Sequence, residues 1–216
     1  LLHWPRILGF GSRILAVELL NVFRENVDYL MIGRLLSLRA LGVYYFAFNA
    51  GLGFSLSVIN ALGVSLYSDL CDIRSHPDLL RRRFGDNIRT TSLVMMPLVL
   101  LQCSLAPLYV PVLFGTTWVA AGALPILMLI CLSALSRPFA NASSMLFRAV
   151  GLPQVDLHWN MVFTAVLILA ILLGTLGGIL GVAVAVAVVH LGLQPIYLLM
   201  GQAMLRRRQN LQLTTH

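Results

Sequence analysis

The chain has 216 residues, of which 59% are hydrophobic and 11% charged, with a net charge of +7 and a mean hydropathy of +0.88. A soluble domain is about 45–50% apolar and about 25% charged, so this composition excludes a soluble globule and indicates an integral membrane protein. Every basic residue is an arginine, and most lie beside apolar runs. Without a basic helix or strand face, this charge argues against nucleic acid as a partner.

Six apolar segments are long enough to cross a membrane, since a span takes about 20 residues plus a short loop. They are expected at about 11–33, 42–67, 88–113, 119–150, 155–173 and 179–205. The fourth is expected to kink at Pro138, because proline bends membrane helices. In the sixth, Val182–Val189 alternates with period two, as a strand would, but both sets of residues are apolar and carry no inside/outside signal. An apolar run with too little polar lining for a barrel is expected to be a helix. Gly177 with Gly181 forms a GxxxG that favours close helix packing. The predicted fold class is all-α, a polytopic membrane helix bundle.

The arginines in the connections predict the topology. Most lie on one side of the expected spans: Arg74, Arg81, Arg82, Arg83, Arg89, Arg148, Arg206, Arg207 and Arg208. The other side has Arg34 and Arg39, so both chain ends are predicted to be cytoplasmic. The clusters Arg81, Arg82, Arg83 and Arg206, Arg207, Arg208 also predict contacts with anionic lipids. The longest connection, 69–89, is expected to lie on the membrane surface as a basic amphipathic segment.

The chain is expected to be cut from a longer one, since it opens at Leu1 without an initiator methionine or a signal peptide. Residues 1–10 are then a cytoplasmic lead-in, 11–205 a six-helix transmembrane unit, and 206–216 a basic cytoplasmic tail.

The first expected span has a polar face. Its polar residues are Arg13, Glu18, Asn21, Arg24, Glu25 and Asp28. At about 100° per residue these six fall within an arc of about 140°. Each charge at mid-bilayer costs about 2.5–3.5 kcal/mol, so this face is expected to meet water or polar protein rather than lipid.

Two interpretations of this face remain open. In the first, Arg24 and Asp28, four residues apart, form a structural ion pair. In the second, which we favour because six aligned groups exceed what one pair needs, the face lines a hydrated cavity for a charged substrate. Its arginines suit phosphate or pyrophosphate, and its carboxylates suit coupling to H⁺ or Na⁺. Arg137, just before Pro138, either joins this cavity or snorkels at the kink.

Catalytic motifs are missing from the sequence, which has no GxSxG, HExxH, P-loop or Asp-rich metal motif. Its three cysteines and five histidines have no metal-ligand spacing. We therefore expect neither an enzyme nor a cofactor. His190, inside the sixth expected span, is expected to be a packing or hydrogen-bonded residue rather than a proton relay.

Three stretches resemble a known family. Asn26–Arg34 with Ala40–Tyr45 resembles the patterns N-x-D-x-x-x-I-G-R and A-L-G-x-Y, Val112–Trp118 resembles V-L-F-G-x-x-W, and Arg148–Pro153 resembles A-x-G-x-P. In this order, and over nearly the whole chain, they resemble the polysaccharide-biosynthesis flippases of the multidrug/oligosaccharidyl-lipid/polysaccharide exporter superfamily.

The resemblance implies a lipid-linked oligosaccharide flippase of the bacterial inner membrane. Such proteins have two six-helix lobes around a central cationic cavity, and this chain resembles the C-terminal lobe, which implies a missing N-terminal lobe. The implied substrate is an undecaprenyl-pyrophosphate-linked glycan, and Arg13 and Arg24 match cavity arginines by position.

A multidrug antiporter lobe is disfavoured, because arginines repel cationic drugs. A non-transporting membrane scaffold remains an alternative. A membrane-embedded glycosyltransferase or polymerase is a further option, but it would normally need a large polar loop, which this sequence lacks.

Overall fold

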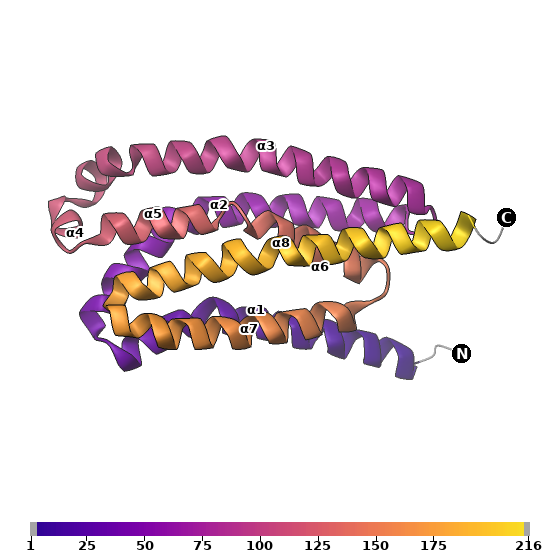
Figure 1. Ribbon diagram of the computed structural model, residues 1–216, viewed down its shortest axis with the longest axis horizontal. Helices are drawn as coiled ribbons and strands as arrows, with labels where there is room; N and C mark the ends of the chain where they lie inside the picture. Colours follow the sequence, from indigo (N-terminus) through magenta and orange to yellow (C-terminus); the bar gives the residue numbers. More distant parts are fainter. Residues whose placement is uncertain (1–3, 214–216) are drawn as a thin grey trace.

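The computed structural model describes residues 4–213; the side chains at 4–11, 13, 14, 17, 54, 77 and 210–213 are outside that description. Long antiparallel helices lie side by side, and no strand occurs among the described residues (Figure 1). The α-helices are α1 (Trp4–Leu35), α2 (Leu38–Asp72), α3 (Pro77–Tyr109), α4 (Thr116–Ala120), α5 (Ala123–Ser133), α6 (Arg137–Ala149), α7 (Pro153–Gly174) and α8 (Gly178–Leu213). A π-helical turn (Val110–Phe114) extends α3, and a 3₁₀ turn (Thr175–Gly177) joins α7 to α8. The all-helical fold class is thus confirmed over these residues.

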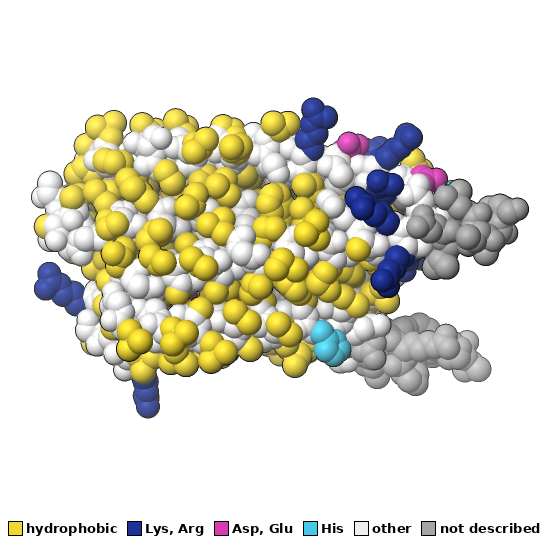
Figure 2. Space-filling view, viewed as in Figure 1, with side chains coloured by type: hydrophobic (Ala, Val, Ile, Leu, Met, Phe, Trp, Pro, Cys, Tyr) yellow, Lys and Arg dark blue, Asp and Glu magenta, His cyan; other side chains and the backbone are white. Residues whose placement is uncertain are grey.

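Three helical stretches within residues 4–213 are long and apolar enough to cross a membrane: Asp78–Phe114, Ala123–Ala149 and Pro153–Gln209. The third comprises α7, α8 and the turn between them. A fourth is α2, if its two parts, bent by 46° at residue 54, count as one span. Hydrophobic side chains cover much of the visible face, and arginines gather toward its ends (Figure 2). These findings support a membrane location, whereas the count of six spans stays a prediction.

Two expected boundaries are changed in the structure. The connection expected over 69–89 is shorter in the structure, because α2 continues to Asp72 and α3 already begins at Pro77, and a position of this stretch at the membrane surface stays a prediction. The break in the fourth expected span lies at 134–136, between α5 and α6. Pro138 then occupies the first turn of α6, where the missing N–H of proline costs no helical hydrogen bond.

The bend in α2 is supported by donors from two other helices. Gln102 of α3 donates from Nε2 to the Ala50 carbonyl at 2.9 Å, and the Tyr109 hydroxyl reaches the same oxygen at 3.4 Å. Cys131 of α5 donates from Sγ to the Gly51 carbonyl at 3.2 Å. Backbone carbonyls at a bend in a membrane helix need such partners, because lipid supplies none.

The turn between α7 and α8 brings two glycines together. A Cβ at Gly174 would lie 2.8 Å from the Gly181 carbonyl oxygen, and one at Gly181 would lie closer still to the Gly174 carbonyl. A Cβ at Gly177 would meet nothing within 4 Å. Close packing is therefore present as expected, but Gly181 pairs with Gly174 across the helices rather than acting with Gly177.

Candidate functional site

A cavity of about 390 Å³ lies among α1, α2, α6, α7 and α8. It falls within the range of about 300–1,000 Å³ that is usual for small-molecule sites. Its lining is rich in polar side chains: Glu18, Asn21, Arg24, Glu25, Asn60, Arg137, Asn141, Ser144, Arg148, Asn160, Gln194 and Tyr197. Apolar and aromatic residues, among them Trp159 and Phe163, complete the wall. The polar face of α1 thus lines a cavity, while Leu15, Leu19 and Leu30 on its other side are exposed.

A buried carboxylate, Asp156 of α7, organises one wall of this cavity. It is fully buried, and it accepts hydrogen bonds from four side chains. The donors are Ser144 Oγ at 2.8 Å, Arg148 Nε at 2.9 Å, Asn160 Nδ2 at 2.7 Å and Tyr197 Oη at 2.9 Å. A buried carboxylate is tolerated when it is paired and its lone pairs are satisfied, so this cluster joins α6, α7 and α8 rigidly.

Arg148 connects that cluster to α1. Its Nη1 donates to Glu18 Oε1 while its Nε donates to Asp156. The Arg148 side chain is 10% exposed and that of Glu18 is 51% exposed. Two carboxylates therefore neutralise this one guanidinium, and it is not available as a free cation for a ligand.

Arg24 and Arg137 differ from Arg148 in this respect. Neither has a carboxylate within salt-bridge distance among the described residues. The Arg24 guanidinium donates to Asn160 Oδ1 at 2.6 Å and lies 5.2 Å from the centre of the Phe163 ring. The Arg137 guanidinium lies 5.8 Å from the centre of the Phe48 ring. Desolvated cations gain from such rings, but these contacts replace a counter-ion incompletely.

Three buried polar atoms at the cavity have no hydrogen-bond partner in the part of the chain that the structure describes. They are Asn21 Oδ1, Arg137 Nε and Gln194 Oε1. A buried donor or acceptor left unpaired costs about 1–3 kcal/mol. The cavity therefore offers one charged donor and two amide acceptors to whatever occupies it.

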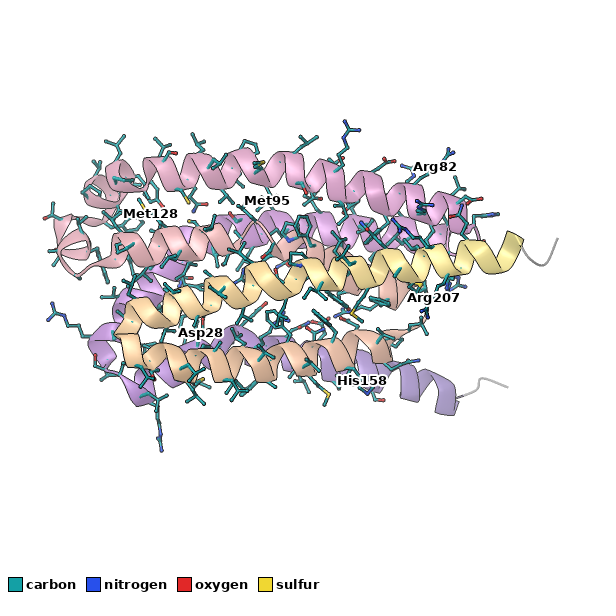
Figure 3. The ribbon with its side chains drawn as sticks, viewed as in Figure 1. Asp28, Arg82, Met95, Met128, His158 and Arg207 are labelled. Carbon is teal, nitrogen blue, oxygen red and sulfur yellow. The ribbon has the colours of Figure 1, made fainter. Side chains whose placement is uncertain are left out.

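Asp28 lies outside this cavity. It is 5% exposed, and it borders a smaller hollow of about 20 Å³ together with Arg24, Glu25, Arg137 and His190. Its oxygens accept from the Tyr44 hydroxyl at 2.7 Å and the Tyr29 amide at 3.0 Å. Figure 3 labels Asp28 toward the end of the bundle opposite Arg207. The first interpretation of the polar face, an Arg24–Asp28 ion pair, is thus not realised among these residues.

Five of the other residues predicted for the site come together at the cavity. Glu18, Asn21, Arg24 and Glu25 of α1 meet Arg137 of α6 at the cavity. The side chain of Arg13 lies outside the described residues. His190 is 5% exposed, its Nδ1 lies 2.9 Å from the Val186 carbonyl, and its ring packs on the edge of Phe163, which confirms a packed, hydrogen-bonded histidine.

Several cavity residues were missed from the sequence. The sequence assigns Arg148 to topology, whereas in the structure it lines the cavity with its side chain 10% exposed. Asn160 also lines the cavity, and it belongs to a row of buried polar residues, Asp156, Asn160 and Thr164, that recur every four residues in an apolar span. That spacing places them on one helix face, and it is the signal that would have found this wall.

A polar cavity among apolar helices is typical of membrane proteins that handle a polar ligand. The family described as polysaccharide biosynthesis protein matches residues 2–123. The chain belongs to this polysaccharide biosynthesis protein family, which confirms the resemblance drawn from its motifs. No solved structure matches the chain.

Curated relatives agree with this family at low identity. The chain is 24% identical over 185 residues to the lipopolysaccharide biosynthesis protein WzxC of Escherichia coli, covering 85% of this chain and 37% of the relative. It is 24% identical over 152 residues to the teichuronic acid biosynthesis protein TuaB of Bacillus subtilis, covering 70% and 31%. It is 27% identical over 171 residues to the amylovoran biosynthesis protein AmsL of Erwinia amylovora, covering 76% and 42%. The chain therefore spans well under half of each.

Proposed function

We propose that this chain is the C-terminal lobe of a flippase that moves a lipid-linked oligosaccharide across the bacterial inner membrane. The observation that carries the proposal is the cavity-lining pair Arg24 and Arg137, which lack a carboxylate partner among the described residues. Membership of a polysaccharide biosynthesis family supports a glycan precursor as the cargo. The protein is then a transporter rather than an enzyme.

The two guanidiniums would bind the pyrophosphate of an undecaprenyl-pyrophosphate-linked glycan. Guanidinium groups bind phosphate oxygens with two parallel hydrogen bonds, and they do so more strongly where water is excluded. Arg137 Nε has no protein partner in the described structure, so a phosphate oxygen there would satisfy it. Asn21 and Gln194 would accept hydrogen bonds from sugar hydroxyls in the same cavity.

Transport would proceed by alternating access, with this lobe rocking against a second, N-terminal lobe. The chain spans 37% of the lipopolysaccharide biosynthesis protein WzxC. A protein of that length would have room for such a lobe. Both ends of the chain would be cytoplasmic. Glu18 and Glu25, which share the cavity with the arginines, would be the carboxylates available for coupling to H⁺ or Na⁺.

The test is a double substitution, Arg24→Gln with Arg137→Gln, in the full-length protein. A hydrogen bond to a charged group contributes about 1.5–3 kcal/mol, and about 1.4 kcal/mol corresponds to a tenfold change in binding. Loss of both arginines is therefore expected to lower the initial rate of glycan export at least about tenfold. The measurement is surface glycan produced per unit of membrane-inserted protein.

A charge-matched control is Arg34→Gln with Arg39→Gln. Both of these arginines are exposed and neither lines the cavity, so export is expected to stay within about twofold of the parent. Unchanged export in the Arg24/Arg137 variant would contradict the proposal and would favour a scaffold role. Equal loss in both variants would show that total charge, and not the cavity, matters.

A further inference from the structure

A second hollow lies between α3 and α8, away from the substrate cavity. It has a volume of about 210 Å³ and is lined by Arg81, Phe84, Gly85, Gln202, Leu205 and Arg206. Phe84 and Leu205 are buried and give it an apolar floor. No acidic residue is among the residues that line it, so two guanidiniums face one small, partly apolar space.

One of these arginines is held in place by a chain of hydrogen bonds between the two helices. Gln209 of α8 donates from Nε2 to Asp78 Oδ1 at 2.7 Å. The same amide accepts at Oε1 from Arg81 Nη1 at 2.9 Å. Arg81 is thereby positioned at the hollow with further N–H donors to spare, because guanidinium has five. Arg206 makes no salt bridge or side-chain hydrogen bond with the described residues.

The hollow lies where an apolar surface gives way to charge. Leu199 of α8 is 61% exposed, and Arg206 follows it by about 10 Å of helix at about 1.5 Å per residue. Figure 2 shows arginine side chains gathered at this end of the molecule, and Figure 3 labels Arg82 and Arg207 there. A molecule seated between Arg81 and Arg206 could thus place apolar chains along Leu199.

We propose that this hollow, which we call the α3–α8 pocket, binds the phosphate of one anionic phospholipid as a discrete site. The pocket is smaller than sites for drug-sized ligands, which measure about 300–1,000 Å³, and it suits a head group rather than a glycan. Basic pockets between membrane helices are known to hold anionic head groups. Arg82 and Arg207, next in sequence to the pocket arginines, are exposed but do not line it, so they contribute only diffuse attraction.

The test uses purified full-length protein in detergent, titrated with phosphatidylglycerol and followed by native mass spectrometry of bound lipid. Arg81→Gln with Arg206→Gln removes both pocket charges. Arg82→Gln with Arg207→Gln removes the same net charge outside the pocket. Gly85→Leu fills the pocket and keeps every charge, since a Cβ at Gly85 meets nothing within 4 Å.

We expect the Arg81/Arg206 and Gly85 variants each to weaken the tightest phosphatidylglycerol binding at least about tenfold. The Arg82/Arg207 control should change it by less than about twofold, and phosphatidylcholine should show no difference among the variants. Equal weakening in both arginine pairs, or no effect of Gly85→Leu, would overturn the proposal. Displacement of the lipid by millimolar inorganic phosphate alone would also overturn it, in favour of a free-anion site.

Discussion

At the scale of single residues, the cavity separates arginines that are neutralised from arginines that are not. Arg148 has two carboxylates, Glu18 and Asp156, within salt-bridge distance. Arg24 and Arg137 have aromatic rings instead. Removing one partner of a buried ion pair is more damaging than removing an exposed charge, because the other partner is left uncompensated. The same cavity therefore contains charges that stabilise the fold and charges that are free to bind.

Asp156→Asn tests the stabilising set. The amide would leave Arg148 with Glu18 as its remaining counter-ion and would present N–H groups to donors, so we expect the free energy of unfolding to fall by about 3–5 kcal/mol. Asp86→Asn, at an exposed carboxylate of α3, should stay within about 0.5 kcal/mol of the parent. The measurement is denaturant unfolding of the purified protein in detergent. Equal stability of the two variants would show that the Asp156 cluster is unimportant for the fold.

Tyr44→Phe tests the contact between the two halves of the first family motif. It removes the hydroxyl that donates to Asp28 Oδ2 and leaves a buried carboxylate oxygen unpaired, which costs about 1–3 kcal/mol. Tyr45→Phe is the matched control, since Tyr45 is 56% exposed whereas Tyr44 is fully buried. Thermal unfolding followed by circular dichroism would distinguish them. A Tyr44 variant as stable as the Tyr45 variant would contradict this role.

At the scale of elements, the family motifs mainly form contacts between helices and turns, and Arg148 of the third motif also lines the cavity. The first motif joins α1 to α2 through Asp28 and Tyr44. In the second, Trp118 stacks on Phe46 of α2 with ring centres 4.2 Å apart, after a turn in which Gly115 has a φ of 89°. In the third, Gly151 has a φ of 78° just before Pro153 begins α7. A positive φ favours glycine, so these patterns record turns.

Gly181→Ala tests the closest approach of two helices. An added Cβ would meet the Gly174 backbone, which cannot move aside like a flexible side chain, so we expect a loss of about 1–3 kcal/mol, as for other overpacked sites. Gly192→Ala in the same helix meets nothing within 4 Å and should be neutral or stabilising by up to about 1 kcal/mol. The comparison is the midpoint of thermal unfolding. Equal midpoints for the Gly181 and Gly192 variants would show that α7 and α8 can move apart at little cost to accept the added methyl group.

At the scale of the whole molecule, successive connections between the long helices alternate between the two ends of the bundle. The N-terminus, the α2–α3 connection and the C-terminus lie at one end, while α4 and the α7–α8 turn lie at the other (Figure 1). The end with the chain termini also has the Arg81 and Arg206 pocket. The charge bias predicts that this end of the bundle is cytoplasmic.

Cysteine labelling tests this orientation. Ser75 and Thr116 are both exposed, in the α2–α3 connection and in α4 respectively. With Cys71, Cys103 and Cys131 replaced, Thr116→Cys in spheroplasts should react with an impermeant maleimide, and Ser75→Cys should react at least about fivefold less, since a charged reagent cannot cross the bilayer core. Inside-out vesicles should reverse the order. The same order in both preparations would contradict cytoplasmic chain ends.

The sequence by itself determined the membrane class, the helical fold and the polar face of α1. Each depends on local information: the hydropathy of a segment, and the period that places Glu18, Asn21, Arg24 and Glu25 on one side of a helix. The family resemblance was also readable, because its motifs are short turns with glycine and proline at defined places. These features can be predicted from the sequence alone because residues close in sequence are also close on the helix.

The tertiary structure alone decided which partner each charged group has. Arg148 meets Glu18 across 130 positions of sequence, and Arg24 meets Asn160 across 136. Gly181 packs on Gly174 rather than forming a surface with Gly177. Helical periodicity defines a face but not what it faces, because the partner depends on how distant helices pack. The polar face of α1 was therefore predictable, whereas the distinction between its neutralised and its unpaired arginines was not.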